Sequence, residues 1–249
     1  MFDKEIARIN DFLDIKKKEK HLDVLKYRKK LSWPEGGGRN IVLMDDIALE
    51  LGSPRTGSVS FLLWTQDQGN IKDGRIRVVG PDLPKLYKND TKDVPFGKIV
   101  LLAVNGFDEE NTYERYREIE AIRFDVDLKG YMMKAASQYQ REWSRISHEA
   151  MNQKFSLSHL GTDLINRYRQ LDYIDAVELI FITSSAEDLK QLQETATRVG
   201  RVISAMNKML EEMSFDCDEC EYVDVCDEVE ELGKMKSSIE ASEKAGRHE

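Results

Sequence analysis

The middle of the chain carries the hydrophobic patterns of β-strands. Residues 59–64 form a compact run of β-branched, aromatic and aliphatic side chains, and residues 75–79 alternate polar with apolar positions. The residues between them, 70–74, predict a turn, and Gly80-Pro81 ends the second run. Residues 98–104 are almost continuously apolar, which predicts a third strand in the interior of a sheet. A further apolar strand is predicted over residues 176–183.

Helical periodicity dominates on both sides of these strands. It predicts a helix over residues 4–31, which Trp33-Pro34 and three glycines interrupt. A long helix is predicted over 109–139, where Gly130 marks a kink or a break. A short junction at 141–147 then leads into a helix that continues through Met151. Ser156 or Ser158 is predicted to cap a helix that runs to residue 170, and a last long helix covers 185–213.

These elements predict an α+β fold in which a mixed sheet is flanked by helices. We divide the chain into an N-terminal helical segment at 1–33, an α+β domain at 34–213 and a cysteine-bearing segment at 214–232. The remaining residues, 233–249, are polar, and we expect them to form a frayed or disordered tail.

Charge and composition narrow the classes of function. The 249 residues carry a formal net charge of −9 and a pI near 5.2, which argues against a general nucleic-acid binder. No apolar run is long enough to span a membrane, and the first residues are acidic rather than a hydrophobic leader. The few cysteines are clustered, which suits a reducing compartment. We therefore expect a cytoplasmic protein with no membrane or nucleic-acid partner.

All three cysteines, Cys217, Cys220 and Cys226, lie in one acidic stretch with a C-x2-C-x5-C pattern. The short first gap lets a tight turn aim two thiolates at one metal ion or cluster. A closed zinc or iron–sulfur site has four ligands, so one ligand would come from elsewhere. The alternative is that these are ordinary thiols on an acidic segment, and the spacing alone leaves both interpretations open.

No complete catalytic motif is present in the sequence. The four histidines lack the spacing of a metal site, and there is no nucleophile elbow, Walker motif or dinucleotide fingerprint. The sequence therefore predicts no catalytic residue.

Basic side chains gather around Trp143. Arg141 and Arg145 flank it, and Arg167 lies one helix further on. Guanidinium groups bind phosphate oxygens through paired hydrogen bonds, and an indole face can stack on a ring or a cation. This cluster would suit an anionic ligand with an aromatic group, such as a nucleotide or coenzyme A. The alternative is that Trp143 is buried and the arginines pair with neighbouring acids, and spacing alone favours this alternative.

An ordered series of short motifs resembles one known family. The motifs are Glu50-Leu51-Gly52, Val79-Gly80-Pro81-Asp82, Pro95-Phe96-Gly97-Lys98-Ile99-Val100, Trp143-Ser144-Arg145-Ile146-Ser147 and Phe155-Ser156-Leu157-Ser158-His159-Leu160-Gly161. A strand, a helix and the cysteine cluster follow them. In this order, the series resembles the central domain of the acetyl-CoA synthase β subunit of the carbon monoxide dehydrogenase/acetyl-CoA synthase complex, over roughly residues 39–226.

The resemblance implies a fold, ligands and partners. The family's central domain is α+β, and the family enzyme makes acetyl-CoA from carbon monoxide, coenzyme A and a methyl group carried by a corrinoid iron–sulfur protein. Trp143 and Arg145 match the family's coenzyme A motif, and we add Arg141 and Arg167 because they are near in sequence. The three cysteines would match the first ligands of the family's A-cluster, a [4Fe-4S] cubane bridged to a pair of nickel ions.

The sequence departs from the family pattern at this metal centre. The gap before Cys226 is shorter than in the family, no cysteine follows it, and the nickel-binding Cys-Gly-Cys is absent. We therefore expect a protein of anaerobic one-carbon metabolism that binds coenzyme A, an iron–sulfur cluster, nickel or zinc, without a complete A-cluster of its own.

Two functional hypotheses stay open at this point. In the first, the chain acts enzymatically together with a synthase, dehydrogenase or corrinoid-protein subunit that supplies the missing ligands. In the second, it is a non-catalytic scaffold, metal-delivery or regulatory module that kept the fold and docks on such a partner.

Overall fold

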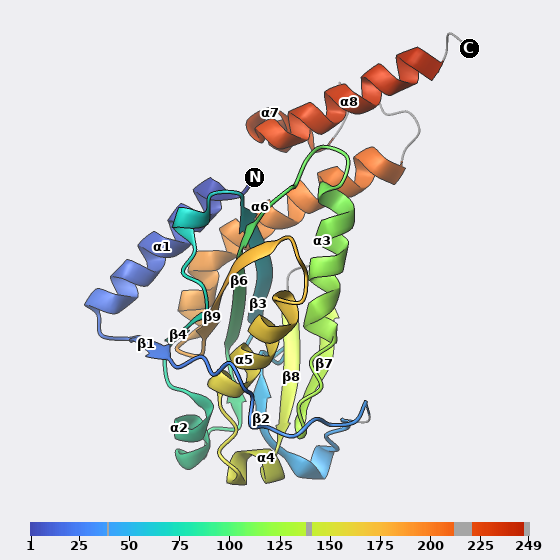
Figure 1. Ribbon diagram of the computed structural model, residues 1–249. Coiled ribbons are helices and arrows are strands. Elements are labelled where there is room, and N and C mark those ends of the chain that lie inside the picture. Colours follow the sequence, from blue (N-terminus) through green and yellow to red (C-terminus); the bar gives the residue numbers. More distant parts are fainter. Residues whose placement is uncertain (39, 138–140, 212–220, 247–249) are drawn as a thin grey trace.

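A computed structural model describes residues 1–38, 40–137, 141–211 and 221–246 as two β-sheets with helices around them (Figure 1). The larger sheet has five strands in the order β1-β4-β9-β6-β3 and the smaller has four in the order β5-β2-β8-β7. Both sheets contain parallel and antiparallel pairs. The predicted α+β class, with mixed sheets and flanking helices, is therefore confirmed. The strands are β1 (Leu22–Leu25), β2 (Ile47–Leu51), β3 (Ser58–Thr65), β4 (Arg75–Val79), β5 (Asp93–Val94), β6 (Phe96–Val104), β7 (Tyr131–Ser137), β8 (Arg141–Ser147) and β9 (Ile174–Ile182).

The four strands predicted from apolar runs all form in the larger sheet. Strands β3, β4, β6 and β9 match the predicted ranges, with ends that differ by at most two residues. Every side chain of β6 is buried, because β6 lies between β3 and β9 and is covered on both faces. A continuous apolar run therefore indicated an interior strand correctly.

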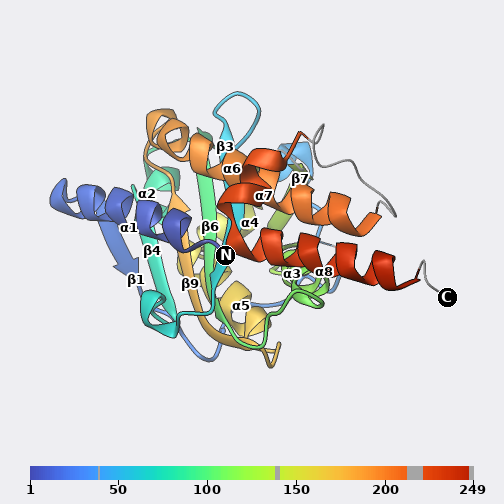
Figure 2. The same cartoon turned by 90° about the horizontal axis from the view of Figure 1, so that it is seen from above.

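Helices cover both faces of the larger sheet. Helices α1 (Asp3–Lys18) and α6 (Ala186–Glu211) lie on one face, and α5 (Leu157–Tyr168) lies on the other (Figure 2). The predicted helices at 156–170 and 185–213 correspond to α5 and α6 and are confirmed. The other described helices are α2 (Leu83–Lys88), α3 (Thr112–Ala121), α4 (His148–Asn152), α7 (Val223–Glu228) and α8 (Glu230–Gly246), with 3-10 turns at η1 (Met44–Asp46), η2 (Gln68–Asn70) and η3 (Ile122–Phe124).

Three predicted segments were wrong where they contain strands, which are held by hydrogen bonds to other strands. The helix expected over 4–31 ends at Lys18, Lys20 takes a left-handed φ of +60°, and β1 then pairs with β4. The helix expected over 109–139 is replaced after η3 by β7, and the junction expected at 141–147 is strand β8. Local periodicity cannot report the hydrogen bonds that partner strands supply.

Helices α7 and α8 lie where the sequence predicted a cysteine-bearing segment and a frayed tail. Leu232 and Met235 of α8 are buried. Two arginines of α6 bind α7, since Arg198 lies 2.7 Å from Glu228 and Arg201 lies 2.5 Å from Asp224. Residues 230–246 form helix α8, which packs against α7 and α6 (Figure 1). The division into four segments stays a prediction.

Within the described residues, no helix combines the length and the apolar character needed to cross a membrane.

A buried ion pair joins the two sheets. Lys98 of β6 and Glu142 of β8 pair with each other and are only 2% and 1% exposed. The Glu142 carboxylate also accepts hydrogen bonds from Ser60 Oγ at 3.1 Å and from the Tyr131 hydroxyl at 3.4 Å. Burial raises the pKa of Tyr131, and the negative charge of Glu142 raises it further, so the phenol stays protonated. Lys98 and Glu142 therefore satisfy each other's charge at the junction of the sheets.

Replacing Lys98 by Met is expected to lower the free energy of unfolding by about 3–5 kcal/mol, because Glu142 is then buried without its counter-charge. Urea unfolding of the purified variant measures the loss. The double variant Lys98→Met/Glu142→Gln is the control and is expected to regain most of the stability, since neither charge is left alone. A single variant within about 1 kcal/mol of the wild type would contradict this role of the ion pair.

Candidate functional site

Strand β8 presents three of the four predicted coenzyme A residues on one face. Side chains alternate along a strand, so Arg141, Trp143 and Arg145 lie on the face opposite to Glu142 and Ser144. Glu142 and Ser144 are buried in the core, whereas Arg141 is exposed and Trp143 is half-buried. Because Glu142 points into the core, Trp143 and Arg141 point away from it, whereas Arg145 on the same face is buried by its neighbours.

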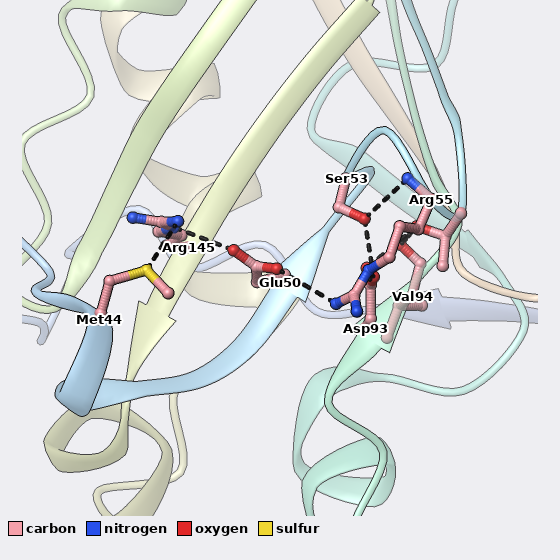
Figure 3. Close-up of polar contacts among 8 residues, drawn as sticks. Met44, Glu50, Ser53, Arg55, Asp93, Val94 and Arg145 are labelled. Atoms are coloured by element: carbon pink, nitrogen blue, oxygen red, sulfur yellow. Dashed lines mark hydrogen bonds and ion pairs between the residues drawn. The ribbon is translucent and has the colours of Figure 1, made fainter.

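Arg145 is held over the Trp143 ring by contacts on several sides. Its guanidinium carbon lies 5.2 Å from the ring centre, which is a cation–π geometry. Its Nε donates a 3.0 Å hydrogen bond to Glu50 Oε1, and Glu50 lies directly opposite Arg145 on the neighbouring strand β2. A terminal nitrogen of Arg145 also contacts Met44 Sδ at 3.3 Å (Figure 3). The guanidinium group of Arg145 therefore already contacts Trp143, Glu50 and Met44 of the protein itself.

Asp93 of β5 fixes the loop between β2 and β3. Its carboxylate accepts hydrogen bonds from Ser53 Oγ at 2.7 Å, Thr56 Oγ1 at 3.0 Å and Arg55 Nε at 3.1 Å. A terminal nitrogen of Arg55 also lies 3.8 Å from Glu50 Oε2. The side chains therefore form a row of alternating charge, which we call the charge row (Figure 3). Its members are Arg145, Glu50, Arg55 and Asp93.

A pocket of about 180 Å³ opens beside Trp143. Its walls come from the β2–β3 loop and from strands β7 and β8, and they include Arg141. The Nε1 atom of Trp143 is buried, and no described residue accepts a hydrogen bond from it. A buried donor without an acceptor is costly in free energy unless water or a ligand provides one. The pocket thus offers an indole surface, an unsatisfied N–H group and one guanidinium.

Gly52 lets the loop approach β8 closely. It takes a left-handed φ of +68°, and an added Cβ would lie 2.5 Å from the Glu142 carbonyl oxygen. The backbone N–H of Glu142 also donates to Ser58 Oγ, at 3.0 Å. The two walls of the pocket therefore meet where only glycine fits.

Arg167, the fourth predicted coenzyme A residue, belongs to a different environment. It lies on α5, where its Nε donates to Asp163 Oδ2 at 2.7 Å. It is not among the residues that line the Trp143 pocket. Arg167 was grouped with Trp143 because the two are near in sequence, but the fold places Arg167 outside the Trp143 pocket.

The sequence reasoning assigned no role to Glu50, Arg55 and Asp93 in the site. Glu50 was part of the motif series, but no spacing indicated that it would bond Arg145. Asp93 is 40 residues from Ser53 along the chain, and only the pairing of β5 with β2 brings them together. A contact between residues so far apart along the chain leaves no local pattern from which a single sequence could predict it.

The predicted metal ligands Cys217 and Cys220 lie outside the described residues. Cys226 is half-buried on α7, where its backbone N–H donates to the Tyr222 carbonyl oxygen at 3.0 Å. Among the residues that are described, no group of three or more His, Cys, Asp and Glu side chains could hold a metal ion. The described donors therefore do not make a metal centre by themselves, and the three-cysteine site stays a prediction.

Comparison with known proteins bears on the region that contains the pocket. Residues 36–188 match the family model of the CO dehydrogenase/acetyl-CoA synthase complex beta subunit. This range includes the charge row and Trp143, whereas the three cysteines lie beyond it.

Curated relatives carry the name acetyl-CoA decarbonylase/synthase complex subunit beta. The chain is 28% identical to the Methanopyrus kandleri protein over 156 residues, which cover 62% of this chain and 32% of that relative. It is 26% identical to subunit beta 2 of Methanosarcina thermophila over 176 residues, covering 70% of this chain and 36% of that relative. A Methanothermobacter thermautotrophicus relative is 26% identical over 149 residues, covering 59% of this chain and 30% of that relative. The chain thus spans about a third of the length of these relatives.

Substituting alanine for Gly52 is expected to destabilise the protein more than the same change at Gly57. Both glycines have left-handed backbones, at φ +68° and +82°, so each substitution should cost about 1–2 kcal/mol of unfolding free energy. Only at Gly52 does the new Cβ meet neighbouring atoms, which adds about 1–3 kcal/mol. Urea unfolding of the two variants measures the difference, and equal losses would contradict the close approach at Gly52.

Proposed function

The chain belongs to the CO dehydrogenase/acetyl-CoA synthase complex beta subunit family, and on that premise we propose that its Trp143 pocket binds coenzyme A. One observation carries the proposal. A half-buried indole with an unsatisfied N–H group shares a pocket with the exposed guanidinium of Arg141. Coenzyme A has a ring that stacks, amide and ring acceptors for an N–H donor, and phosphates for a guanidinium.

The size of the pocket limits how much of the ligand it takes. At about 180 Å³ it is smaller than the roughly 300–1,000 Å³ that is usual for whole small-molecule ligands. It would therefore hold one portion of coenzyme A, with the remainder outside. In this arrangement Trp143 stacks on the ligand, Arg141 contacts an anionic group, and Arg145 positions the Trp143 ring.

The pocket proposal assigns binding rather than chemistry. Because the match covers only about a third of each relative, we assign no catalytic residue to this chain. We propose that the chain works in anaerobic acetyl-CoA metabolism, in the cytoplasm, beside synthase, dehydrogenase or corrinoid-protein subunits. A non-catalytic scaffold, metal-delivery or regulatory module would use the same pocket to sense or carry the ligand.

A second proposal concerns Cys217, Cys220 and Cys226. Thiolates with this spacing bind an iron–sulfur cluster, nickel or zinc, and the fourth ligand would come from a partner or an oxygen donor. Acidic neighbours would make a bound cluster more negative and lower its reduction potential. The described residues contribute one of the three thiols, Cys226.

Coenzyme A is expected to quench the tryptophan fluorescence of the wild-type chain, and Trp143→Phe should remove that response. Trp33→Phe is the matched control and should keep it, because the Trp33 indole donates to the Lys129 carbonyl oxygen elsewhere in the fold. Calorimetry should show binding to Trp143→Ala weakened by roughly 5- to 150-fold, which corresponds to the loss of one stacked ring. Unchanged affinity in Trp143→Ala would reject the pocket as the coenzyme A site.

Anaerobically purified protein is expected to contain about one metal ion or one brown iron–sulfur chromophore per chain. Cys217→Ser and Cys220→Ser should each lose it, because a thiolate ligand is removed. Iron, nickel, zinc and sulfide analysis measures the content. Coenzyme A binding in the same variants is the control for folding, since the Trp143 pocket is built from other residues. Colourless, metal-free wild-type protein under these conditions would contradict the proposal that the cysteines bind a metal.

A further inference from the structure

The charge row is electrically balanced, although it contains two arginines. Arg145 pairs with Glu50, and Arg55 pairs with Asp93, so the row of four side chains has no formal net charge. Arg141, on the neighbouring pocket wall, is exposed, and no acid among the described residues pairs with it. Among the residues that line the pocket, Arg141 is the one with a positive charge.

Glu50 occupies the position between the two arginines. Its carboxylate lies 3.0 Å from Arg145 Nε and 3.8 Å from a terminal nitrogen of Arg55, and its side chain is 14% exposed. Two guanidinium groups that converge on one oxyanion are the usual way in which proteins bind a phosphate group. In this chain, the anionic group between the two guanidinium groups is the carboxylate of Glu50.

Arg55 is held in place but remains open to solvent. Its Nε and one terminal nitrogen both contact Asp93 at 3.1 Å, while 78% of its side chain is exposed. Asp93 is in turn fixed by the hydroxyls of Ser53 and Thr56. Loss of the Glu50 charge would therefore leave a pre-positioned pair of guanidinium groups with one positive charge in excess.

We propose that Glu50 determines which anions bind beside the Trp143 pocket, because its carboxylate takes the place of a phosphate between Arg145 and Arg55. The charge row does not line the pocket but adjoins it, since Arg145 stacks on the Trp143 ring. The wild-type site then rejects small polyanions and accepts a ligand only when a ring stacks on Trp143 and one anionic group reaches Arg141. The identity of that ring-bearing ligand rests on the proposed function. The exclusion of small polyanions by Glu50 is independent of the proposed function.

The direct test compares the binding of inorganic pyrophosphate to the wild type and to Glu50→Gln by calorimetry. Glutamine keeps the size and the acceptor oxygen but removes the charge, so affinity should rise about tenfold and the gain should shrink as salt is added. Glu149→Gln is the matched control, since Glu149 pairs with Lys129 on the exposed surface and its change should leave pyrophosphate affinity as it was. A folded Glu50→Gln variant that binds pyrophosphate no better than the wild type overturns the proposal.

A second measurement does not depend on the folding of Glu50→Gln. If Glu50 and Asp93 together neutralise the two arginines of the charge row, Arg141 carries the salt dependence of the binding of adenosine 3′,5′-bisphosphate to the otherwise wild-type chain. Arg141→Gln should then bind this nucleotide weakly and almost independently of salt. Lys190→Gln, which removes an exposed positive charge from α6, should keep the wild-type dependence. A steep salt dependence retained in Arg141→Gln would overturn the proposal.

Failure of this inference and failure of the proposed function give different results. A chain that does not bind coenzyme A, but in which Glu50→Gln gains affinity for pyrophosphate, supports the role of Glu50 and rejects the coenzyme A pocket. A chain that binds coenzyme A through Trp143, but in which Glu50→Gln gains nothing, supports the pocket and rejects the role of Glu50.

Discussion

The Lys98–Glu142 ion pair fixes the relation between the two sheets and, through it, the direction of the candidate site. Glu142 lies one residue before Trp143, and neighbouring side chains in a strand point to opposite faces. A shift of β8 by one residue would bury the indole and expose the carboxylate. Glu142 meets its buried counter-charge Lys98 only in the observed register of β8. The residues of the inner face therefore determine that Trp143 lies on the outer face.

The two faces of β8 use charge in different ways. Behind the strand, burial raises the pKa of Tyr131, and the negative charge of Glu142 raises it further, so the phenol beside the Lys98–Glu142 pair stays protonated. On the outer face, the members of the charge row neutralise one another, and only Arg55 among them is largely exposed to solvent. The candidate site is therefore built over a buried polar cluster, while its own charged groups lie in a balanced row beside the pocket.

The sequence predicted the strands whose signal lies in their own residues and missed those that depend on a partner. Strand β6 is apolar throughout and could be identified alone, whereas β8 alternates arginine, tryptophan and buried polar residues that resemble a surface junction. Family resemblance pointed to Trp143 and Arg145 before the strand that carries them was known. It could not show that Arg145 is bonded to Glu50, because that contact follows from the pairing of β8 with β2. Arg167 was added by sequence proximity, although its partner Asp163 lies only four residues before it on α5.

The attachment of α7 to α6 has a consequence for chain entropy. Arg198 contacts Glu5 of α1 and Glu228 of α7, both at 2.7 Å, so α6 is tied at one position to the segments before and after it. The chain therefore leaves α6 at its end, and the next described helix, α7, is bound to α6 again. Loop-closure entropy for the intervening residues, which include Cys217 and Cys220, is already met by the fold. That part of the entropy is therefore lost when the protein folds and not when a ligand binds to these residues.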